Sequence, residues 1–400
     1  MKPPEPWQFL FAGQGPRRWL ALGDHEALGL PQRAVRHRLQ VRLRAATCAE
    51  QAHAALDTWQ AWRDAGLAVA GYLGYDLGAA LEGVVPQPHD SPWPDADLCA
   101  FDPRDLQPLS LPATDCRDAL PLPEDLLRQR GWFQDAVAQA LDAIRAGEIY
   151  QVNLSVAAAL PFALRSSPIA ALAATLAVQP VPYAMVWQNP AGLLVSGSME
   201  SFLRAQGPAV LSRPIKGTAP RQIAPDADWL AAQTLAATVK ERAENTMIVD
   251  MVRNDLQRAC AWQSVEVPAL CEATAYATLW HLESEVRGVL RHPDDRAGLL
   301  QATLPPASVT GCPKIQATRV IGQIERRWRG PYCGALGVDL PGVGLDLAVG
   351  IRQVWLESGC ARLQVGAGIV AQSEPAREWQ ELCVKAQGAL RLLATLSEPA

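Results

Sequence analysis

Several kinds of segment are missing from this 400-residue chain, and each absence excludes a class of protein. No stretch reaches 18 uninterrupted apolar residues, so we expect no membrane-spanning helix. No run of lysine or arginine is long enough for a nucleic-acid-binding stripe, and the net charge of −5 also disfavours a polyanionic partner. The first residues, MKPPEPWQFLFAGQG, carry prolines and a glutamate where a signal peptide needs an apolar run. These absences predict a cytoplasmic protein that binds neither nucleic acid nor membrane.

A disulfide framework and a zinc site are also missing. The nine cysteines are odd in number and scattered, and no two of them form a C-x-x-C pair. This pattern is typical of reduced thiols in a cytosolic protein. Cys312 and Cys333 lie in glycine-containing motifs, but a free cysteine is most simply a small buried residue of the core, so we assign no cysteine chemistry.

The hydrophobic content of 49% is sufficient for a large core. Helical spacing of apolar residues predicts helices over 50–65 and 132–146, and the segment YQVNLS after the second helix reads as a strand. Glycines at 71, 74 and 78 predict a strand that bends or approaches another backbone closely. The proline-rich stretch 86–123 predicts a surface connection, which divides the chain into an amino-terminal region, residues 1–123, and a second region, residues 124–400.

One lysine lies in an unusual setting, the stretch LSRPIKGTAPR. Lys216 is flanked by Pro214 and Pro220 and followed by Gly217 and Thr218, which predicts a stiff loop that presents one amine to a ligand close to the main chain. The alternative from composition alone is an ordinary solvated lysine, because most lysines are exposed.

Two pairs of glutamates have helical spacing. Glu241 and Glu244 share one face of a predicted helix, and Glu378 and Glu381 share a face with Lys385 on a helix opened by proline. Solvent exposure is the ordinary explanation for such a pair. The chemical one is Mg²⁺, which takes one or two carboxylates together with water and substrate oxygens.

The segment SVTGCPKIQATRVI predicts a helix whose amino terminus follows Thr310 and offers free N–H groups to an anion. His281, in WHLES, is by itself most simply a core histidine.

PIKGT, with Glu200 upstream in GSMES, resembles the chorismate-binding enzymes, and within that family the branch of aminodeoxychorismate synthase component I. In the anthranilate synthase branch, alanine usually replaces the lysine. The water-using isochorismate and salicylate synthases carry a base lysine where this chain has Gln151, so the resemblance implies ammonia as the nucleophile. It also implies an α+β fold with a two-layer antiparallel β core and helices packed outside, in which residues 1–123 pack onto a catalytic domain of residues 124–400.

The resemblance further assigns roles to single residues. Lys216 would attack chorismate to form a covalent adduct, Glu200 would act as general acid and base, and His281 would orient the reacting groups. Two groups of residues would hold the substrate and Mg²⁺. The substrate-binding residues are Gly217, Thr218, Thr310, Tyr332, Arg352, Gly366, Gly368 and Lys385, and the metal-binding ones are Glu241, Glu244, Glu378 and Glu381, with Glu244 and Glu381 the direct ligands.

The implied product is 4-amino-4-deoxychorismate, a precursor of p-aminobenzoate and folate, with ammonia supplied by a separate glutamine amidotransferase subunit. Three alternatives stay open: anthranilate synthase component I, a catalytically silent subunit that binds chorismate or tryptophan, and, because of Gln151, isochorismate synthase in last place. The sequence leaves open the oligomeric state and any tryptophan site in the amino-terminal region.

Overall fold

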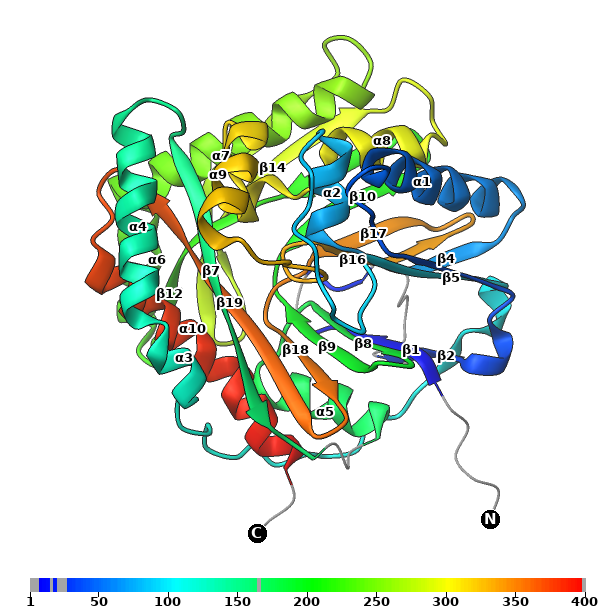
Figure 1. Ribbon diagram of the computed structural model, residues 1–400, viewed down its shortest axis with the longest axis horizontal. Helices are drawn as coiled ribbons and strands as arrows, with labels where there is room; N and C mark the ends of the chain where they lie inside the picture. Colours follow the sequence, from blue (N-terminus) through cyan, green and yellow to red (C-terminus); the bar gives the residue numbers. More distant parts are fainter. Residues whose placement is uncertain (1–6, 15–16, 20–26, 164–166, 398–400) are drawn as a thin grey trace.

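The computed structural model describes residues 7–14, 17–19, 27–163 and 167–397, so the prolines and glutamate of residues 1–6 lie outside the described residues. Two antiparallel sheets form the core, and buried side chains from both join one contiguous apolar cluster. Figure 1 shows the helices arranged around these sheets. The predicted α+β fold with a two-layer antiparallel core is confirmed.

Among the residues that the structure describes, the first sheet has nine strands. In spatial order they are β15 (Gly311–Cys312), β7 (Gln151–Pro161), β19 (Cys360–Val370), β18 (Gln353–Glu357), β9 (Gly192–Ser198), β8 (Tyr183–Asn189), β1 (Trp7–Ala12), β2 (Ala27–Pro31) and β6 (Gln107–Pro108). The long pair β7 and β19 stays in register from Gln151 opposite Val370 to Pro161 opposite Cys360.

The second sheet has ten strands in the described part of the chain. In order they are β12 (Ile215–Pro220), β14 (Leu279–Val289), β11 (Ala209–Arg213), β10 (Ser201–Gln206), β17 (Gly344–Val349), β16 (Ala335–Leu340), β4 (Ala68–Leu73), β5 (Ala96–Phe101) and β3 (His37–Val41), with β13 (Glu266–Ala275) paired to β14. Strands from before residue 124 therefore complete both sheets, and the two regions of the chain share one core.

Helices pack on the outer faces of both sheets. Those on the first sheet are α3 (Glu124–Arg128), α4 (Arg130–Arg145), α5 (Pro168–Val178), α9 (Lys314–Glu325) and α10 (Pro375–Leu396). Those on or beside the second are α1 (Cys48–Asp64), α2 (Tyr75–Leu81), α6 (Pro225–Ala237), α7 (Val239–Ala259) and α8 (Arg296–Thr303), and short 3₁₀ turns cover 32–34, 103–105 and 307–309. Among the residues that the structure describes, no helix is long and apolar enough to cross a bilayer.

The helices predicted over 50–65 and 132–146 and the strand at YQVNLS are confirmed as α1, α4 and β7. Three local predictions were wrong. The proline-rich stretch 86–123 contains the buried strand β5, because its six residues are free of proline. Gly78 lies in helix α2 and not in a strand, although a Cβ there would indeed collide with the backbone of Pro305. The lysine segment is the edge strand β12, where Pro220 is tolerated at the strand end.

Candidate active site

A cavity of about 450 Å³ opens where the two sheets meet helices α7 and α10, a volume in the range of small-molecule sites. Most of the residues predicted from the sequence line it. They are Glu200, Lys216, Gly217, Thr218, Glu241, Glu244, His281, Tyr332, Arg352, Gly366, Gly368, Glu381 and Lys385. They come from segments spread over residues 200–385, so the fold is what brings them together.

Lys216 reaches the cavity because strand β12 is irregular. The pairing of β12 with β14 shifts register between Ile215 and Thr218, and Gly217 between them has φ of +83°, in the left-handed region. Such a bulge re-aims a side chain, and only glycine adopts this backbone conformation without strain. A side chain at residue 217 would also strike Glu241, since an added Cβ would lie 2.8 Å from its Oε2.

The amine of Lys216 lies between the two sheets. Its Nζ is 3.8 Å from Glu244 Oε2 on α7, and a Cβ added at Gly368 on β19 would lie only 2.9 Å from it. The glycine at 368 therefore leaves the space that the amine fills. The other oxygen of Glu244 is 3.8 Å from Lys240 Nζ, so this carboxylate stands between two amines.

Glu200 lies in the short connection between β9 of the first sheet and β10 of the second, and it is 6% exposed. Burial raises the pKa of its carboxyl to about 7, although hydrogen bonds with Ser308 and with the Ile215 backbone and the charge of Lys216 act in the opposite direction. A carboxyl group with this pKa exists in both protonation states near neutral pH, which suits a general acid and base.

His281 lies on β14, opposite Thr218 of β12, and is 1% exposed. Burial and then the charge of Arg352 lower its pKa to about 4, so the ring is neutral at physiological pH. The ring edge packs on Tyr276 at 4.9 Å, and Nδ1 has no hydrogen-bond partner among the described residues. A neutral imidazole in a fixed position can orient a ligand through hydrogen bonds. It is not in the positively charged form that would act as an acid.

The carboxylates of α7 and α10 face one another across the cavity. Burial and the like charges of Glu241 and Glu381 contribute to a raised pKa for Glu244, against the effect of the neighbouring lysines. Burial acts to raise the pKa of Glu381 as well, but the nearby lysines, above all Lys385 at 2.6 Å, bring it below its usual value.

These oxygen donors have the chemistry that a hard cation such as Mg²⁺ requires. As the side chains stand, no group of three or more His, Cys, Asp or Glu among the described residues is close enough to form a metal centre. The glutamates therefore offer the type of ligand atom that Mg²⁺ binds, and in this structure Glu244 and Glu381 form ion pairs with lysines.

The far end of the cavity carries a hydroxyl and a guanidinium. Arg352 has φ of +54°, its Nη1 donates to the Lys385 carbonyl, and burial lowers its pKa. A Cβ added at Gly366 would lie 2.9 Å from the Tyr332 hydroxyl, so the glycine makes room for the phenol. Lys385 Nζ donates to the Gly366 carbonyl at 3.2 Å. This arrangement presents positive charge and donors to an anionic ligand.

Two predicted residues lie off the cavity. Thr310 is fully buried and its hydroxyl donates to the Pro306 carbonyl at 2.8 Å, while Glu378 accepts a hydrogen bond from Ser373 at 2.6 Å. Gln151, which bears on the choice of nucleophile, is fully buried beside Gly368, and neither polar atom of its amide has a hydrogen-bond partner among the described residues.

Sequence reasoning missed Lys240 and Ser308, which both line the cavity. Lys240 and Glu244 have the i, i+4 spacing of a helical ion pair, so this partner carried a readable signal. Ser308 reaches Glu200 only through the tertiary fold, and no local pattern indicates that contact.

Comparisons with known proteins identify the family to which this chain is similar. A model of the chorismate binding enzyme family matches residues 114–391. An aminodeoxychorismate synthase of Streptomyces pristinaespiralis is 40% identical over 263 residues, covering 65% of this chain and 36% of that protein. Anthranilate synthase component 1 of Thermus thermophilus is 38% identical over 259 residues, covering 65% of this chain and 56% of that protein. The chain thus matches about a third to just over half of the length of these relatives.

Two solved structures share the fold. Anthranilate synthase component I of Streptococcus pneumoniae superposes with a TM-score of 0.67 at 25% identity, covering 82% of this chain and 80% of that one. The menaquinone-specific isochorismate synthase of Escherichia coli gives 0.71 at 21% identity, covering 97% and 89%. With the family match spanning more than half of its residues, the chain belongs to the chorismate binding enzyme family.

Proposed function

We propose that this chain converts chorismate and ammonia into 4-amino-4-deoxychorismate, as component I of an aminodeoxychorismate synthase. The observation that carries the proposal is the place of Lys216, whose amine lies in the cavity against Gly368 and in the same cavity as Glu200. A chorismate-utilising site with a nucleophile and a carboxyl of pKa about 7 contains the two groups that a covalent substitution needs.

Substrate binding follows from charge. Chorismate is a dianion, and the cavity offers the cations of Arg352, Lys385 and Lys240 together with the Tyr332 hydroxyl. Arg352 can hold one carboxylate through two parallel hydrogen bonds. Gly366 and Gly368, which lack side chains, leave room on strand β19 for the Tyr332 hydroxyl and the Lys216 amine, which would contact the ligand.

The reaction we propose has two substitutions. Lys216 Nζ forms a bond to ring carbon 2, the ring double bonds shift, and the bond from carbon 4 to its hydroxyl breaks as Glu200 delivers a proton, so that water leaves. Ammonia then bonds to carbon 4, the double bonds shift back, and the bond to Lys216 breaks while Glu200 takes up a proton. The sum is chorismate plus ammonia giving 4-amino-4-deoxychorismate and water, with the enolpyruvyl group retained.

We also propose Mg²⁺ as the cofactor, with Glu244 and Glu381 as the direct ligands and Glu241 acting through water, while Glu378 stays bound to Ser373 off the cavity. When bound, Mg²⁺ would neutralise a substrate carboxylate and act as a Lewis acid. The carboxylates on α7 and α10 would hold the cation, and with it one carboxylate of the substrate, beside these two helices. The other carboxylate of the substrate would then point towards Tyr332.

Ammonia would come from a separate glutamine amidotransferase subunit, and the product would serve p-aminobenzoate and folate synthesis. This element of the proposal rests on the resemblance to aminodeoxychorismate synthase component I, and none of the nine cysteines in these 400 residues lies in the small-residue elbow of a glutaminase nucleophile.

Anthranilate synthesis is the second candidate, since the relative from Thermus thermophilus, named anthranilate synthase component 1, is 38% identical. In that reaction ammonia bonds to ring carbon 2 and pyruvate leaves. An amine already bound at carbon 2 is incompatible with that outcome, so the proposed role of Lys216 separates the two reactions.

The test is a mass spectrum of what the purified protein makes from chorismate, Mg²⁺ and an ammonium salt, beside Lys216→Ala. An amino product that keeps the enolpyruvyl carbons, lost in the variant, supports the proposal. Anthranilate with pyruvate overturns it in favour of the second candidate. No turnover at any ammonia concentration points to a silent chorismate-binding subunit.

A further inference from the structure

Residues 326–334 connect helix α9 to strand β16 and carry Tyr332 into the cavity. This connection forms neither helix nor regular strand, and three of its residues, Arg326, Gly330 and Cys333, have φ between +47° and +63°. An irregular segment of this kind keeps one conformation only where its surroundings hold its backbone groups. Those surroundings lie partly in the amino-terminal region of the chain.

Asp76 on helix α2, which does not itself line the cavity, holds the backbone of this segment. Its Oδ2 accepts hydrogen bonds from the backbone N–H groups of Arg329 at 3.0 Å and Gly330 at 2.7 Å. The neighbouring Tyr75 N–H donates to the Gly330 carbonyl at 2.7 Å. Asp76 is 4% exposed, so water cannot replace these contacts readily.

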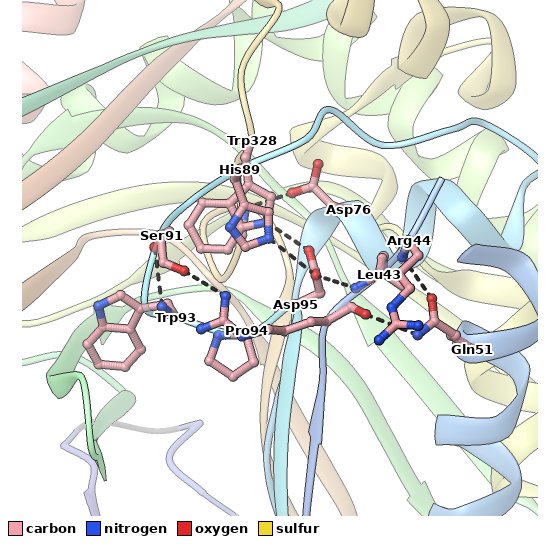
Figure 2. Close-up of polar contacts among 12 residues, drawn as sticks. Leu43, Arg44, Gln51, Asp76, His89, Ser91, Trp93, Pro94, Asp95 and Trp328 are labelled. Carbon is pink, nitrogen blue, oxygen red and sulfur yellow. Dashed lines mark hydrogen bonds and ion pairs between the residues drawn. The ribbon is translucent and has the colours of Figure 1, made fainter. Parts of the chain in front are cut away.

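A second buried aspartate, Asp95, lies beside the first, just before strand β5. It accepts hydrogen bonds from the Trp328 indole at 2.7 Å and from the Leu43 backbone N–H at 2.8 Å. His89 stacks on Trp328 at 4.2 Å, with its Nε2 3.4 Å from Asp95. Figure 2 shows both aspartates beside Trp328. Asp95 therefore fixes a side chain of the segment, whereas Asp76 fixes its backbone.

The backbone that Asp76 fixes leads directly into the cavity wall. The Arg329 guanidinium, 1% exposed, donates to the carbonyls of Asn153 at 2.5 Å and Val309 at 3.3 Å, and both of these residues line the cavity. Three residues after Arg329 stands Tyr332. On the far side of the segment, Gln353 donates to the Pro331 carbonyl at 2.9 Å.

We propose that Asp76 is a positioning residue for substrate binding: by accepting the N–H groups of Arg329 and Gly330, it sets the conformation of residues 328–334 and thereby the place of Tyr332 in the cavity. The amino-terminal region of the chain thus contributes to the substrate site without touching the substrate. Burial raises the pKa of Asp76 to about 7, and the neighbouring Asp95 adds to the effect, which fits a carboxyl kept for its hydrogen bonds rather than for its charge. The inference rests on the proposed function only for the identity of the substrate.

Three variants test this role. Asp76→Ala removes the acceptor, and Asp76→Asn keeps a carbonyl oxygen that can accept the same two N–H groups. The matched control is Asp97→Ala on strand β5, which also removes a buried aspartate outside the cavity, but one that accepts hydrogen bonds from Trp187 and Asn189 instead of from the segment that carries Tyr332. Each variant is compared in amide hydrogen exchange of residues 328–334, in steady-state kinetics with chorismate, and in thermal unfolding.

In Asp76→Ala, the backbone amides of Arg329 and Gly330 are expected to exchange their hydrogens faster. KM for chorismate should rise about tenfold, which corresponds to the loss of one good hydrogen bond to the ligand, while kcat should change less than about threefold. Asp76→Asn should restore both readouts, and Asp97→Ala should lower the unfolding temperature without changing either. Unchanged exchange and KM in Asp76→Ala, or an equal rise of KM in Asp97→Ala, would overturn the role. If the wild type does not turn over chorismate at all, the proposed function fails, and the exchange measurement still decides whether Asp76 holds the segment.

Discussion

The cavity has two walls that differ in how firmly their side chains are held. One wall, here called the sheet wall, is formed by the strands and the connections between the elements, and it consists of Glu200, His281 and Tyr332. These three residues are at most 6% exposed, and they are packed against or hydrogen-bonded to neighbouring residues. The helix wall, consisting of Lys240, Glu241, Glu244, Glu381 and Lys385, comes from α7 and α10 and contains looser pairs. Lys240 and Lys216 both stand 3.8 Å from Glu244, and the Glu381 side chain is 52% exposed.

We infer from this difference that the two walls have different roles. Buried groups with fixed partners are preorganised, so they can hold a reacting atom without reorganising as charge develops. Partly exposed ion pairs contribute little to stability and exchange partners readily, so a substrate carboxylate or a cation can replace a lysine–glutamate contact at small cost. We therefore expect losses of Glu200 and His281 in the sheet wall to affect kcat, and losses in the helix wall, like a displacement of Tyr332, to affect binding.

The largest effect is expected for Lys216, which projects from the second sheet to the helix wall. Lys216→Ala removes the proposed nucleophile and should lower kcat by about 10³-fold or more, the order seen when a covalent nucleophile is lost. Lys240→Ala is the matched control, because Lys240 stands at the same distance from Glu244. It should change kcat less than about tenfold, as expected for a partly exposed charge pair. Equal losses in the two variants, measured by single-turnover kinetics, would show that Lys216 acts only as a charge.

Glu200→Gln should lower kcat by about 10²-fold or more, the usual contribution of a general acid. In the wild type, kcat/KM should fall as pH rises above about 7, because the carboxyl then loses the proton it has to deliver. The variant should lack that fall. An identical pH profile in the variant would assign the titration to another group and remove Glu200 from the proton-transfer step.

The same substitution is expected to stabilise the protein. The folded-state pKa of Glu200 is raised from 4.5 to about 7, so folding favours the protonated form, and the wild type loses stability progressively as pH rises from 4.5 to 7. Glutamine is neutral throughout. At pH 8, Glu200→Gln should therefore unfold with a free energy higher by about 1–3 kcal/mol, whereas at pH 4 the two should agree within about 0.5 kcal/mol. Urea unfolding at both pH values measures this, and a variant less stable at pH 8 would contradict it.

The helix wall can be tested through Mg²⁺. Glu244→Gln should raise the Mg²⁺ concentration for half-maximal activity about tenfold or more, as expected when one carboxylate of such a site is lost. Glu378→Gln is the control on α10, because Glu378 is bound to Ser373 and does not line the cavity. Its Mg²⁺ requirement should change far less than that of Glu244→Gln, because the Glu378 carboxylate does not line the cavity. Calorimetric titration with Mg²⁺ gives an independent value, and equal effects of the two substitutions would place Glu378 among the ligands.

Local patterns in the sequence indicated Lys216 and the two glutamate pairs, whereas the family resemblance supplied the other site residues, among them Glu200, Tyr332 and Arg352. The spacing of Glu241 and Glu244 places both on one face of α7 wherever that helix packs, and the glycine after Lys216 marks the bulge that aims the amine. The helices α1 and α4 followed from apolar periodicity. The two-layer arrangement came from the family resemblance, because periodicity does not determine which strands become neighbours.

Contacts between distant segments could not be predicted in this way. Asp76 lies more than 250 positions before the two N–H groups it binds, and nothing around it in GYDLG indicates them. Ser308 and Glu200 are likewise joined only by the fold. Strand β5 escaped notice because prolines surround it in the sequence, although its own six residues are buried.

The smallest effect on activity is expected behind the sheet wall, at Thr310. The resemblance assigned this residue to substrate binding, but its hydroxyl is fully buried and donates to the Pro306 carbonyl. Thr310→Val keeps the shape and removes the donor, so we expect a loss of about 1 kcal/mol in the free energy of unfolding, the cost of one hydrogen bond. KM for chorismate should stay within about twofold, because a hydrogen bond that the substrate does not share cannot change its affinity directly. A rise of KM at unchanged stability would mean that Thr310 turns towards the ligand when chorismate binds, and the sheet wall would then be less rigid than its buried contacts indicate.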